Sequence, residues 1–243
     1  MITYSIYTSA GSRPVNEDSA AVFENNGRYC FILCDGLGGH GMGDAASQLV
    51  TRCFGEYFQQ SDSCGDFLAP AFEIAQGSLL GEQRRLGAER KMKTTAVCAV
   101  TDGASAFIGH VGDSRFYCFR RNKVKMRTLD HSVPQMLVMS REIKESEIRN
   151  HPDRSLLLRV MGVPWEEPKY ELEKPVPLHK CQAFLLCSDG FWELIEESDM
   201  CSTLKNSNNV QEWLMSMSEI VRRNGEGRDM DNNTAIAVWT DQK

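Results

Sequence analysis

The sequence lacks the features of a membrane protein, a secreted protein and a nucleic-acid-binding protein. No apolar run approaches the ~18 residues that a membrane-spanning helix needs, and the start of the chain lacks the basic and apolar regions of a signal peptide. The 27 basic residues are outnumbered by 33 acidic ones and form no basic block, so the net charge is −6. We therefore expect no membrane partner and no nucleic-acid partner.

Cysteine and histidine lack the spacing of a disulfide framework or a zinc site. The nine cysteines are odd in number and include no C-x-x-C pair, and the five histidines form no H-x-H or H-E-x-x-H arrangement. Most cysteines lie inside apolar runs, where a free thiol packs as a small hydrophobic group (Cys30, Cys34, Cys98 and Cys187). Such usage is typical of a reducing compartment, and we predict a cytoplasmic protein.

Common nucleotide-binding and hydrolase motifs are absent or incomplete. No Gly-Lys-Ser/Thr follows the glycine loop, which excludes a P-loop, and no G-x-S-x-G marks a serine hydrolase. Gly36, Gly38 and Gly41 do satisfy G-x-G-x-x-G after a predicted strand, with Glu56 further along, so a dinucleotide-binding enzyme stays open as an alternative. Against it, Asp35 would lie beside the pyrophosphate, and no regular strand–helix alternation follows.

The hydrophobic pattern predicts an α+β fold. Short apolar or alternating runs predict strands in residues 3–9, 19–25, 28–34, 94–101, 105–112, 115–121, 169–176, 182–188 and 234–240. Helical spacing predicts helices in residues 44–58, 66–87 and 209–223, and a polar, irregular helical stretch in 133–150. Strands cluster with strands, which favours antiparallel sheets with helices on their outer faces. Because no linker or repeat interrupts it, we interpret 1–243 as one domain.

Acidic residues follow or precede apolar strands at several distant points of the chain. Asp35 and Asp189 each end a run that is apolar enough to be buried, and each is followed by glycine. Asp-Gly is favourable turn chemistry, so either residue alone carries no functional inference. Other strand ends carry further acids, which could meet the first two at one rim of the sheets (Glu17, Asp18, Asp113 and Asp231).

Carboxylates gathered at one rim would repel one another and would be costly to bury unpaired. Divalent cations relieve that repulsion, and a ligand set made only of oxygen selects hard ions such as Mg²⁺ or Mn²⁺. Such cations would also allow a protein with a net charge of −6 to bind an anion.

Eight short motifs occur in one order along nearly the whole chain. They are RPVNED (13–18), DGLGGHGMGDAAS (35–47), MKTTAV (92–97), GHVGDSR (109–115), LDHS (129–132), HPDRSLLLRVMG (151–162), LLCSDGFWE (185–193) and DNNT (231–234). In these motifs the chain resembles the type-2C, or PPM-type, metal-dependent Ser/Thr protein phosphatases, in their bacterial-like single-domain form. One tetrapeptide alone would be weak evidence, and the resemblance depends on all eight in order.

The resemblance implies two packed antiparallel β-sheets flanked by α-helices, with a binuclear metal site at one end of the sheets. By position, Asp35 would bridge the two ions, and the carbonyl oxygen of Gly36 would ligate one of them. Asp189 and Asp231 would complete the shell of the other ion.

The resemblance also implies residues around this centre. Asp18 and Glu17 would hold metal-bound waters. Asp113 and Asp189 together match the third-metal site of bacterial-type members. Arg13 matches an arginine that grips the substrate phosphate. The expected cofactors are thus two or three Mg²⁺ or Mn²⁺ ions, and the expected catalytic residues are Arg13, Asp35 and Asp189.

The implied reaction is hydrolysis of phosphoserine and phosphothreonine in proteins. Two cations roughly 4 Å apart lower the pKa of a shared water enough to supply hydroxide near neutral pH, and this hydroxide attacks phosphorus directly. Arg13 and the ions would offset charge on the phosphoryl oxygens. Phosphorylated substrates of a Ser/Thr kinase are the expected partners, and the enzyme is expected to be a monomer. A catalytically silent phosphoprotein-binding regulator is the alternative, but it would lack a bridging acid, and none is missing.

Two positions depart from the family pattern. Leu37 stands where many members carry a histidine proposed as general acid, so another group, such as His40 or a metal-bound water, would protonate the leaving group. The alternative for His40 is a loop histidine without a catalytic role. Lys93 stands where glycine is common. Residues 132–160 match the variable flap beside the active site, which either contacts protein substrates or is a mobile surface helix. We predict framework or core positions for Thr94, Thr95, Ser114, Arg115, Trp192 and Trp239.

Overall fold

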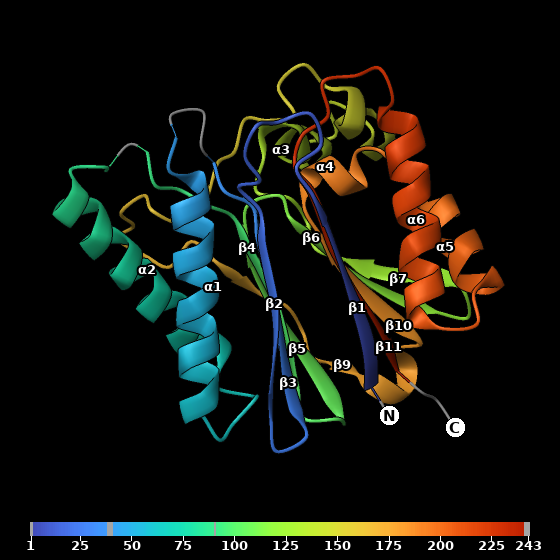
Figure 1. Cartoon of the computed structure of the whole chain (residues 1–243), viewed down its shortest axis with the longest axis horizontal. Helices are drawn as coiled ribbons and strands as arrows, with labels where there is room; N and C mark the ends of the chain where they lie inside the picture. Colours follow the sequence, from blue (N-terminus) through green and yellow to red (C-terminus); the bar gives the residue numbers. More distant parts are fainter. Residues whose placement is uncertain (1, 38–40, 90, 241–243) are drawn as a thin grey trace.

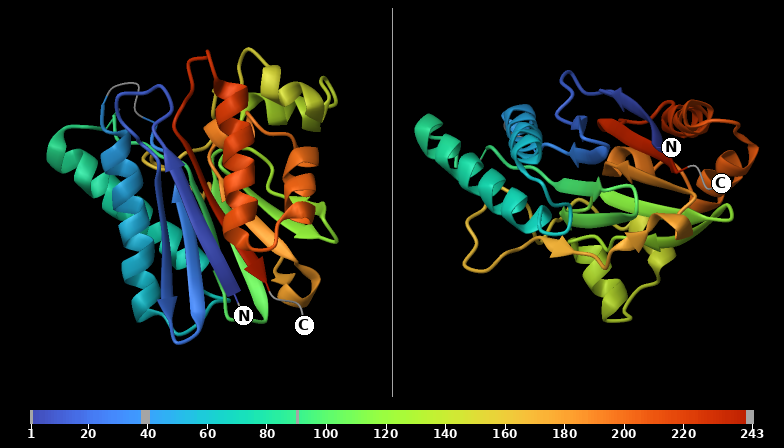
Figure 2. Two further views of the ribbon diagram at one scale, coloured as in Figure 1. Left: turned by 45° about the vertical axis from the view of Figure 1, so that its right-hand side comes forward. Right: turned by 90° about the horizontal axis from the view of Figure 1, so that it is seen from below.

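Two antiparallel sheets lie face to face between two layers of helices (Figure 1 and Figure 2). The structure is a computed structural model that describes residues 2–37, 41–89 and 91–240. In the described ranges the first sheet has the order β1-β11-β10-β6-β7. Its strands are β1 (Ile2–Ser9), β6 (Arg115–Arg120), β7 (Lys123–Arg127), β10 (Ala183–Cys187) and β11 (Asn233–Thr240).

The second sheet has the order β2-β3-β4-β5-β8, and β9 also pairs with β5. Its strands are β2 (Ser19–Asn25), β3 (Arg28–Cys34), β4 (Ala96–Thr101), β5 (Ser105–Val111), β8 (Glu171–Leu172) and β9 (Val176–Pro177). Every pairing between the described strands of both sheets is antiparallel. The predicted α+β fold of two antiparallel sheets flanked by helices is therefore confirmed.

Helices cover the outer face of each sheet. The second sheet packs against α1 (Gly43–Gln60) and α2 (Leu68–Leu86), and the first against α4 (Asp189–Trp192), α5 (Glu197–Asn206) and α6 (Val210–Gly225). No helix among the described residues is both long and apolar enough to cross a bilayer.

Strand β3 shows why the central strands are apolar without alternation. Phe31 and Leu33 point into the layer between the sheets, whereas Ile32 and Cys34 pack against α1 and α2. All four are fully buried. A strand that is buried on both faces has no solvent side on which to carry polar residues. The polar residues of such a chain therefore collect at the strand ends.

The structure differs from the sequence prediction in its short or polar elements. The stretch 133–150 is two helices, α3 (Val133–Met139) and the 3₁₀ helix η1 (Glu145–Asn150), and the predicted strand 169–176 shrinks to the two-residue strands β8 and β9. Strand β7 and helices α4 and α5 were not predicted. They are too short for periodicity to stand out, and α5 buries only Met200 and Leu204.

Candidate metal centre and active site

A cavity of about 830 Å³ opens at the end of the sheets where β11 begins. The start of β1 and the end of β11 lie at the other end of the sheets (Figure 1). All predicted site residues except Asp18 line this cavity: Arg13, Glu17, Asp35, Gly36, Asp113, Asp189 and Asp231. The remaining walls include apolar side chains, among them Val15, Leu37, Leu157 and Val160. The structure thus brings together acids that are up to 214 residues apart in sequence, as Glu17 and Asp231 are.

Asp35 is held at the exit of β3 by the residues that lead into β4. The Thr95 amide donates to the Asp35 carbonyl oxygen over 2.8 Å, and Thr94 Oγ1 donates to the same oxygen over 2.8 Å. The Asp35 amide in turn donates to Thr95 Oγ1 over 3.0 Å. Burial, followed by the charges of Asp189 and neighbouring carboxylates, raises the pKa of Asp35 well above its ordinary value.

Gly36 is required here by close backbone packing. A β-carbon at this position would lie 2.3 Å from the Gly43 carbonyl oxygen and 2.6 Å from the Glu17 carbonyl oxygen. The Gly36 amide donates to that Glu17 oxygen over 3.2 Å, which ties the glycine loop to the chain just before β2. Burial also raises the pKa of Glu17, although a hydrogen bond from the Gly43 amide opposes the rise. The two motifs are thus joined through main-chain contacts.

Asp18 lies behind the cavity wall. Its Oδ2 atom accepts a hydrogen bond from Ser188 Oγ over 2.9 Å, while its Oδ1 atom is buried without a hydrogen-bond partner among the described residues. Burial, with the charges of Asp189 and Asp231, raises the pKa of Asp18 to about 7. A buried carboxylate oxygen needs a partner, and a cation or an ordered water at this position would supply one.

Asp189 is the first residue of α4, which begins one residue after the buried strand β10. The next residue, Gly190, packs so closely that a β-carbon would lie 2.1 Å from the Asn232 carbonyl oxygen. Burial and the charge of Asp231 raise the pKa of Asp189. The Asp-Gly step therefore places a carboxylate at the cavity because only glycine permits the following backbone contact.

Asp231 and Arg13 form one side of the cavity. Arg13 donates from Nε and Nη2 to the two carboxylate oxygens of Asp231 over 3.2 and 3.3 Å, and from Nη1 to Asp229 Oδ2 over 3.2 Å. Asn232 connects this segment to the β2 entry, because its Oδ1 accepts from the Glu17 amide over 2.7 Å. The sequence contained Asn232 only as part of a motif, and its connecting role was not predicted.

Asp113 is held by a buried tryptophan. Trp192 Nε1 donates to the Asp113 carbonyl oxygen over 3.0 Å, and the Trp192 ring stacks on the Arg115 guanidinium at 3.4 Å. Arg115 is 2% exposed and binds both oxygens of Asp130 over 2.8 and 2.7 Å. Burial, followed by the charge of Asp189, raises the pKa of Asp113. The predicted framework position of Arg115 and core position of Trp192 are confirmed, whereas Trp239 is only partly buried.

The donor set suits hard divalent cations. The cavity offers carboxylate oxygens and main-chain carbonyls, and the described residues that line it include neither cysteine nor histidine. The raised pKa values of Asp18, Asp35, Asp113 and Asp189 have a common cause, burial and mutual repulsion, which a bound cation would remove. The residues present therefore fit the metal ions that the sequence implied.

Two expected features need separate comment. Gly38 of the glycine fingerprint and His40, the suggested general acid, lie outside the described residues. The dinucleotide alternative is not supported, since the sheets are antiparallel throughout the described ranges and contain no parallel strand–helix–strand unit. In the predicted flap, Ser155, Leu157 and Val160 line the cavity, so this segment forms one of its walls.

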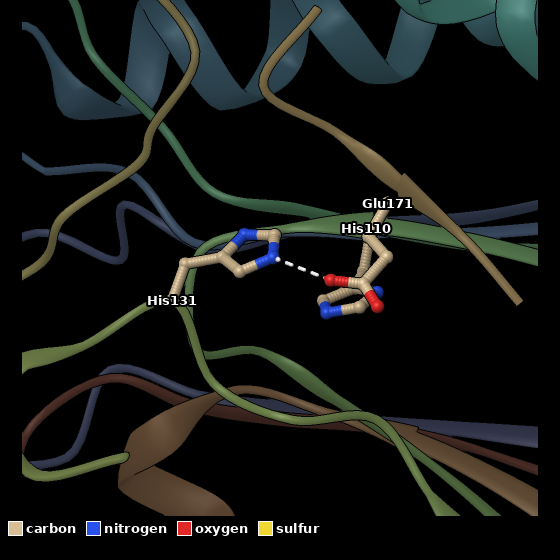
Figure 3. Close-up of side chains that lie close together, drawn as sticks. All are labelled: His110, His131 and Glu171. Atoms are coloured by element: carbon tan, nitrogen blue, oxygen red, sulfur yellow. Dashed lines mark hydrogen bonds and ion pairs between the residues drawn. The ribbon is translucent and has the colours of Figure 1, made fainter. Parts of the chain in front are cut away.

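Sequence spacing missed one cluster of metal-type ligands, made of His110, His131 and Glu171 (Figure 3). One ligand atom from each lies within 4.8 Å of the others. The two rings are stacked, 4.6 Å apart and 18° from parallel. Imidazole lone pairs lie in the ring plane, so rings in this orientation do not aim them at one ion.

Hydrogen bonds assign the cluster a structural role instead. The Gly112 amide donates to His131 Nδ1 over 3.2 Å, which places the ring proton on Nε2, opposite Glu171 Oε2 at 3.4 Å. Burial lowers the pKa of His131 to about 4, so the ring is neutral. His131 therefore supports the backbone at Gly112, the residue before Asp113.

Comparisons with known proteins show what the whole chain is similar to. The model of the protein phosphatase 2C family matches residues 9–235. The chain is 33% identical over 235 residues to a serine/threonine phosphatase stp of Listeria welshimeri, covering 92% of this chain and 89% of that protein. It is 29% identical to the serine/threonine protein phosphatase PstP of Mycobacterium tuberculosis, covering 93% of this chain and 42% of that protein.

Solved structures of bacterial serine/threonine phosphatases have a similar fold. The serine/threonine phosphatase Stp1 from Staphylococcus aureus superposes with a TM-score of 0.91 at 26% identity, covering all of this chain and 96% of that one. The catalytic domain of PstP in complex with two manganese ions superposes with a TM-score of 0.80 at 25% identity, covering 98% and 97%.

Proposed function

The chain belongs to the protein phosphatase 2C family, and from this premise we propose that it hydrolyses phosphoserine and phosphothreonine in proteins in a reaction that depends on Mg²⁺ or Mn²⁺. The observation that carries the proposal is the meeting of Asp35, Asp189 and Asp231 in one cavity. Relatives named serine/threonine phosphatases, one of them solved with two manganese ions, support it.

The proposed ligand roles are those that the resemblance implies, for residues that line the cavity. Asp35 would be shared by two ions, and the Gly36 carbonyl would ligate one of them. Asp189 and Asp231 would ligate the other. Glu17 and Asp18 would hold coordinated waters, and Asp113 with Asp189 would form a third site.

Divalent ions bound here would supply Lewis acidity, which makes an attacking water available near neutral pH and offsets phosphate charge. The residues supply orientation and further charge. Arg13 exposes 42% of its side chain, and its partner Asp229 exposes 74%. Because an exposed ion pair contributes only ~0–1 kcal/mol, Arg13 can exchange Asp229 for phosphate oxygens at little cost. A guanidinium can then bind two of those oxygens at once.

The remaining features of the enzyme follow from the same site. The substrates would be phosphorylated proteins, made by a Ser/Thr kinase. Every proposed ligand comes from one chain, so a monomer would suffice. Residues 1–243 would act as one catalytic domain, with 132–160 as its flap, and the enzyme would work in the cytoplasm.

A metal-dependent phosphopeptide assay tests the proposal. The purified protein should release phosphate from phosphoserine and phosphothreonine peptides with Mn²⁺ or Mg²⁺ and stop when EDTA is added. Asp35→Asn and Asp189→Asn should each lower kcat at least ~100-fold, because each removes a charge aimed at the centre. The exposed Asp62→Asn is the matched control and should behave as the wild type. Wild-type turnover in both site variants would refute the proposal, and binding of phosphopeptides without turnover would favour a silent regulator.

A further inference from the structure

Lys93 occupies a specific place between the glycine loop and the flap. Thr94 bridges to Gly36 on one side and to Met161 on the other, so the residues leading into β4 are paired with both segments. The Leu37 amide donates to the Lys93 carbonyl oxygen over 2.9 Å. Lys93 is half-buried and lines the cavity. It therefore lies on the wall where a substrate chain would run past the catalytic end of the sheets.

Lys93 is an unpaired cation among the described residues of this cavity. Among the described residues that line it, the cationic side chains are those of Arg13 and Lys93. Arg13 is held by Asp231 and Asp229, whereas no described side chain forms an ion pair or hydrogen bond with the Lys93 ammonium. Residues 38–40 and 90 contain no acid in the sequence that could supply a carboxylate. An ammonium without a carboxylate partner, on the wall of an anion-binding cavity, is available for a second anion.

The position of Lys93 sets which part of a substrate it can reach. Thr95 is bonded to Asp35, and Lys93 lies two residues earlier, about 7 Å along an extended chain. A bound peptide advances ~3.5 Å per residue, so this offset corresponds to one or two residues from the phosphorylated side chain. Neighbouring Leu37 and Val160 are apolar, which limits hydration around the ammonium and strengthens a charge pair there.

We propose that Lys93 is a specificity-determining residue, which selects substrates that carry a second anionic group within two residues of the phosphoserine or phosphothreonine. This inference rests on the proposed phosphatase function. The second anion can be an aspartate or glutamate carboxylate or a second phosphate, because an ammonium recognises both as negative oxygens.

Four phosphothreonine peptides that differ only in their neighbouring residues test this. One has alanine neighbours, one aspartate, one a second phosphoserine and one arginine, and kcat/KM is measured at low ionic strength for the threonine phosphate. Wild type should favour the two anionic peptides over the alanine peptide by about fivefold, the size of one partly exposed ion pair. The preference should shrink in ~0.5 M salt. A difference between the carboxylate and phosphate arms would show which group Lys93 prefers.

Three variants separate specificity from a general effect. In Lys93→Met the anionic-to-alanine ratio should fall to about 1 through KM, and in Lys93→Glu the arginine peptide should become the preferred one. Lys91→Met, a nearby exposed lysine, should keep the wild-type ratio. An unchanged ratio in Lys93→Met, or an equal loss on all four peptides, would overturn the inference. If wild type cleaves no peptide, the proposed function itself fails, whereas equal cleavage of all four removes only this inference.

Discussion

Replacing Asp18 with asparagine should stabilise the metal-free protein and weaken its response to metal. Burial and the charges of Asp189 and Asp231 raise the pKa of Asp18 from 3.8 to about 7. Because the folded state holds this proton more tightly than the unfolded chain, metal-free stability falls as pH rises from 3.8 to about 7 and stays low above that. The ionised carboxylate is therefore a net cost to the metal-free fold at pH 8.

The size of the effect follows from the pKa shift and from one buried donor that asparagine would leave without a partner. A shift of about 3 pH units at ~1.36 kcal/mol each corresponds to about 4 kcal/mol. Asparagine removes that cost and can still accept from Ser188 Oγ, but its amide nitrogen would take the place of Oδ1, which has no partner among the described residues. An unsatisfied buried donor destabilises the fold by about 1–3 kcal/mol, which offsets part of this gain. The net gain should be about 2 kcal/mol, or ~4–8 °C in Tm.

Thermal melts in EDTA and in Mn²⁺, at pH 8 and pH 5, measure both effects. In EDTA at pH 8 the Asp18→Asn variant should melt above the wild type, and its advantage should shrink by pH 5, where the folded wild type is protonated. In Mn²⁺ the difference in Tm between the variant and the wild type should shrink or change sign. The reason is that a metal site with tenfold weaker affinity loses about 1.4 kcal/mol of ligand stabilisation. The exposed Asp62→Asn variant should follow the wild type throughout. The reasoning would be refuted if the variant melted below the wild type in EDTA at pH 8, or if Mn²⁺ raised its Tm by as much as it raises the Tm of the wild type.

Two further substitutions test the framework around the cavity. Gly36→Ala would place a β-carbon 2.3 Å from the Gly43 carbonyl oxygen, so the loop must move. We expect this variant to lose the stabilisation by metal in thermal melts. Gly77→Ala, on the open surface of α2, is the control. Arg115→Met would remove both short contacts to the buried Asp130 and leave it only the 3.8 Å ion pair with Arg127. It should cost about 3–5 kcal/mol in urea unfolding, whereas a loss below ~1 kcal/mol would contradict a buried ion pair between Arg115 and Asp130.

The fold was predictable where the sequence pattern is strong. The long strands and the helices α1, α2 and α6 occur close to their predicted ranges, because an extended buried strand or an amphipathic helix of several turns repeats its signal many times. The short elements α4 and β8 have too few residues for a period to be recognised. The polar stretch around α3 and η1 depends on tertiary contacts instead, such as the hydrogen bonds from Arg149 to Glu197 and to the Ile195 carbonyl oxygen.

The acids of the cavity and their meeting at one rim could be predicted, but the contacts that hold them there could not. Asp35 and Asp189 stood out because a carboxylate directly after a buried strand is costly without a partner. No sequence pattern indicated that Asn232 connects the Asp231 segment to Glu17, or that Trp192 holds the Asp113 backbone. The stacking of His110 on His131 was likewise hidden, since the two residues lie on different segments with no shared spacing.

Local hydrophobicity is enough to identify the buried strands, their ends and the acids that stand at those ends, because a buried strand is a run of apolar residues. The meeting of these ends depends on long-range contacts, since antiparallel pairing of distant strands brings the exit of β3, the start of α4 and the entry of β11 to one rim. The same contacts determine which cationic side chain of the cavity has carboxylate partners. Arg13 is bound by two carboxylates and Lys93 by none of the described ones, a difference that depends on distances and not on residue type.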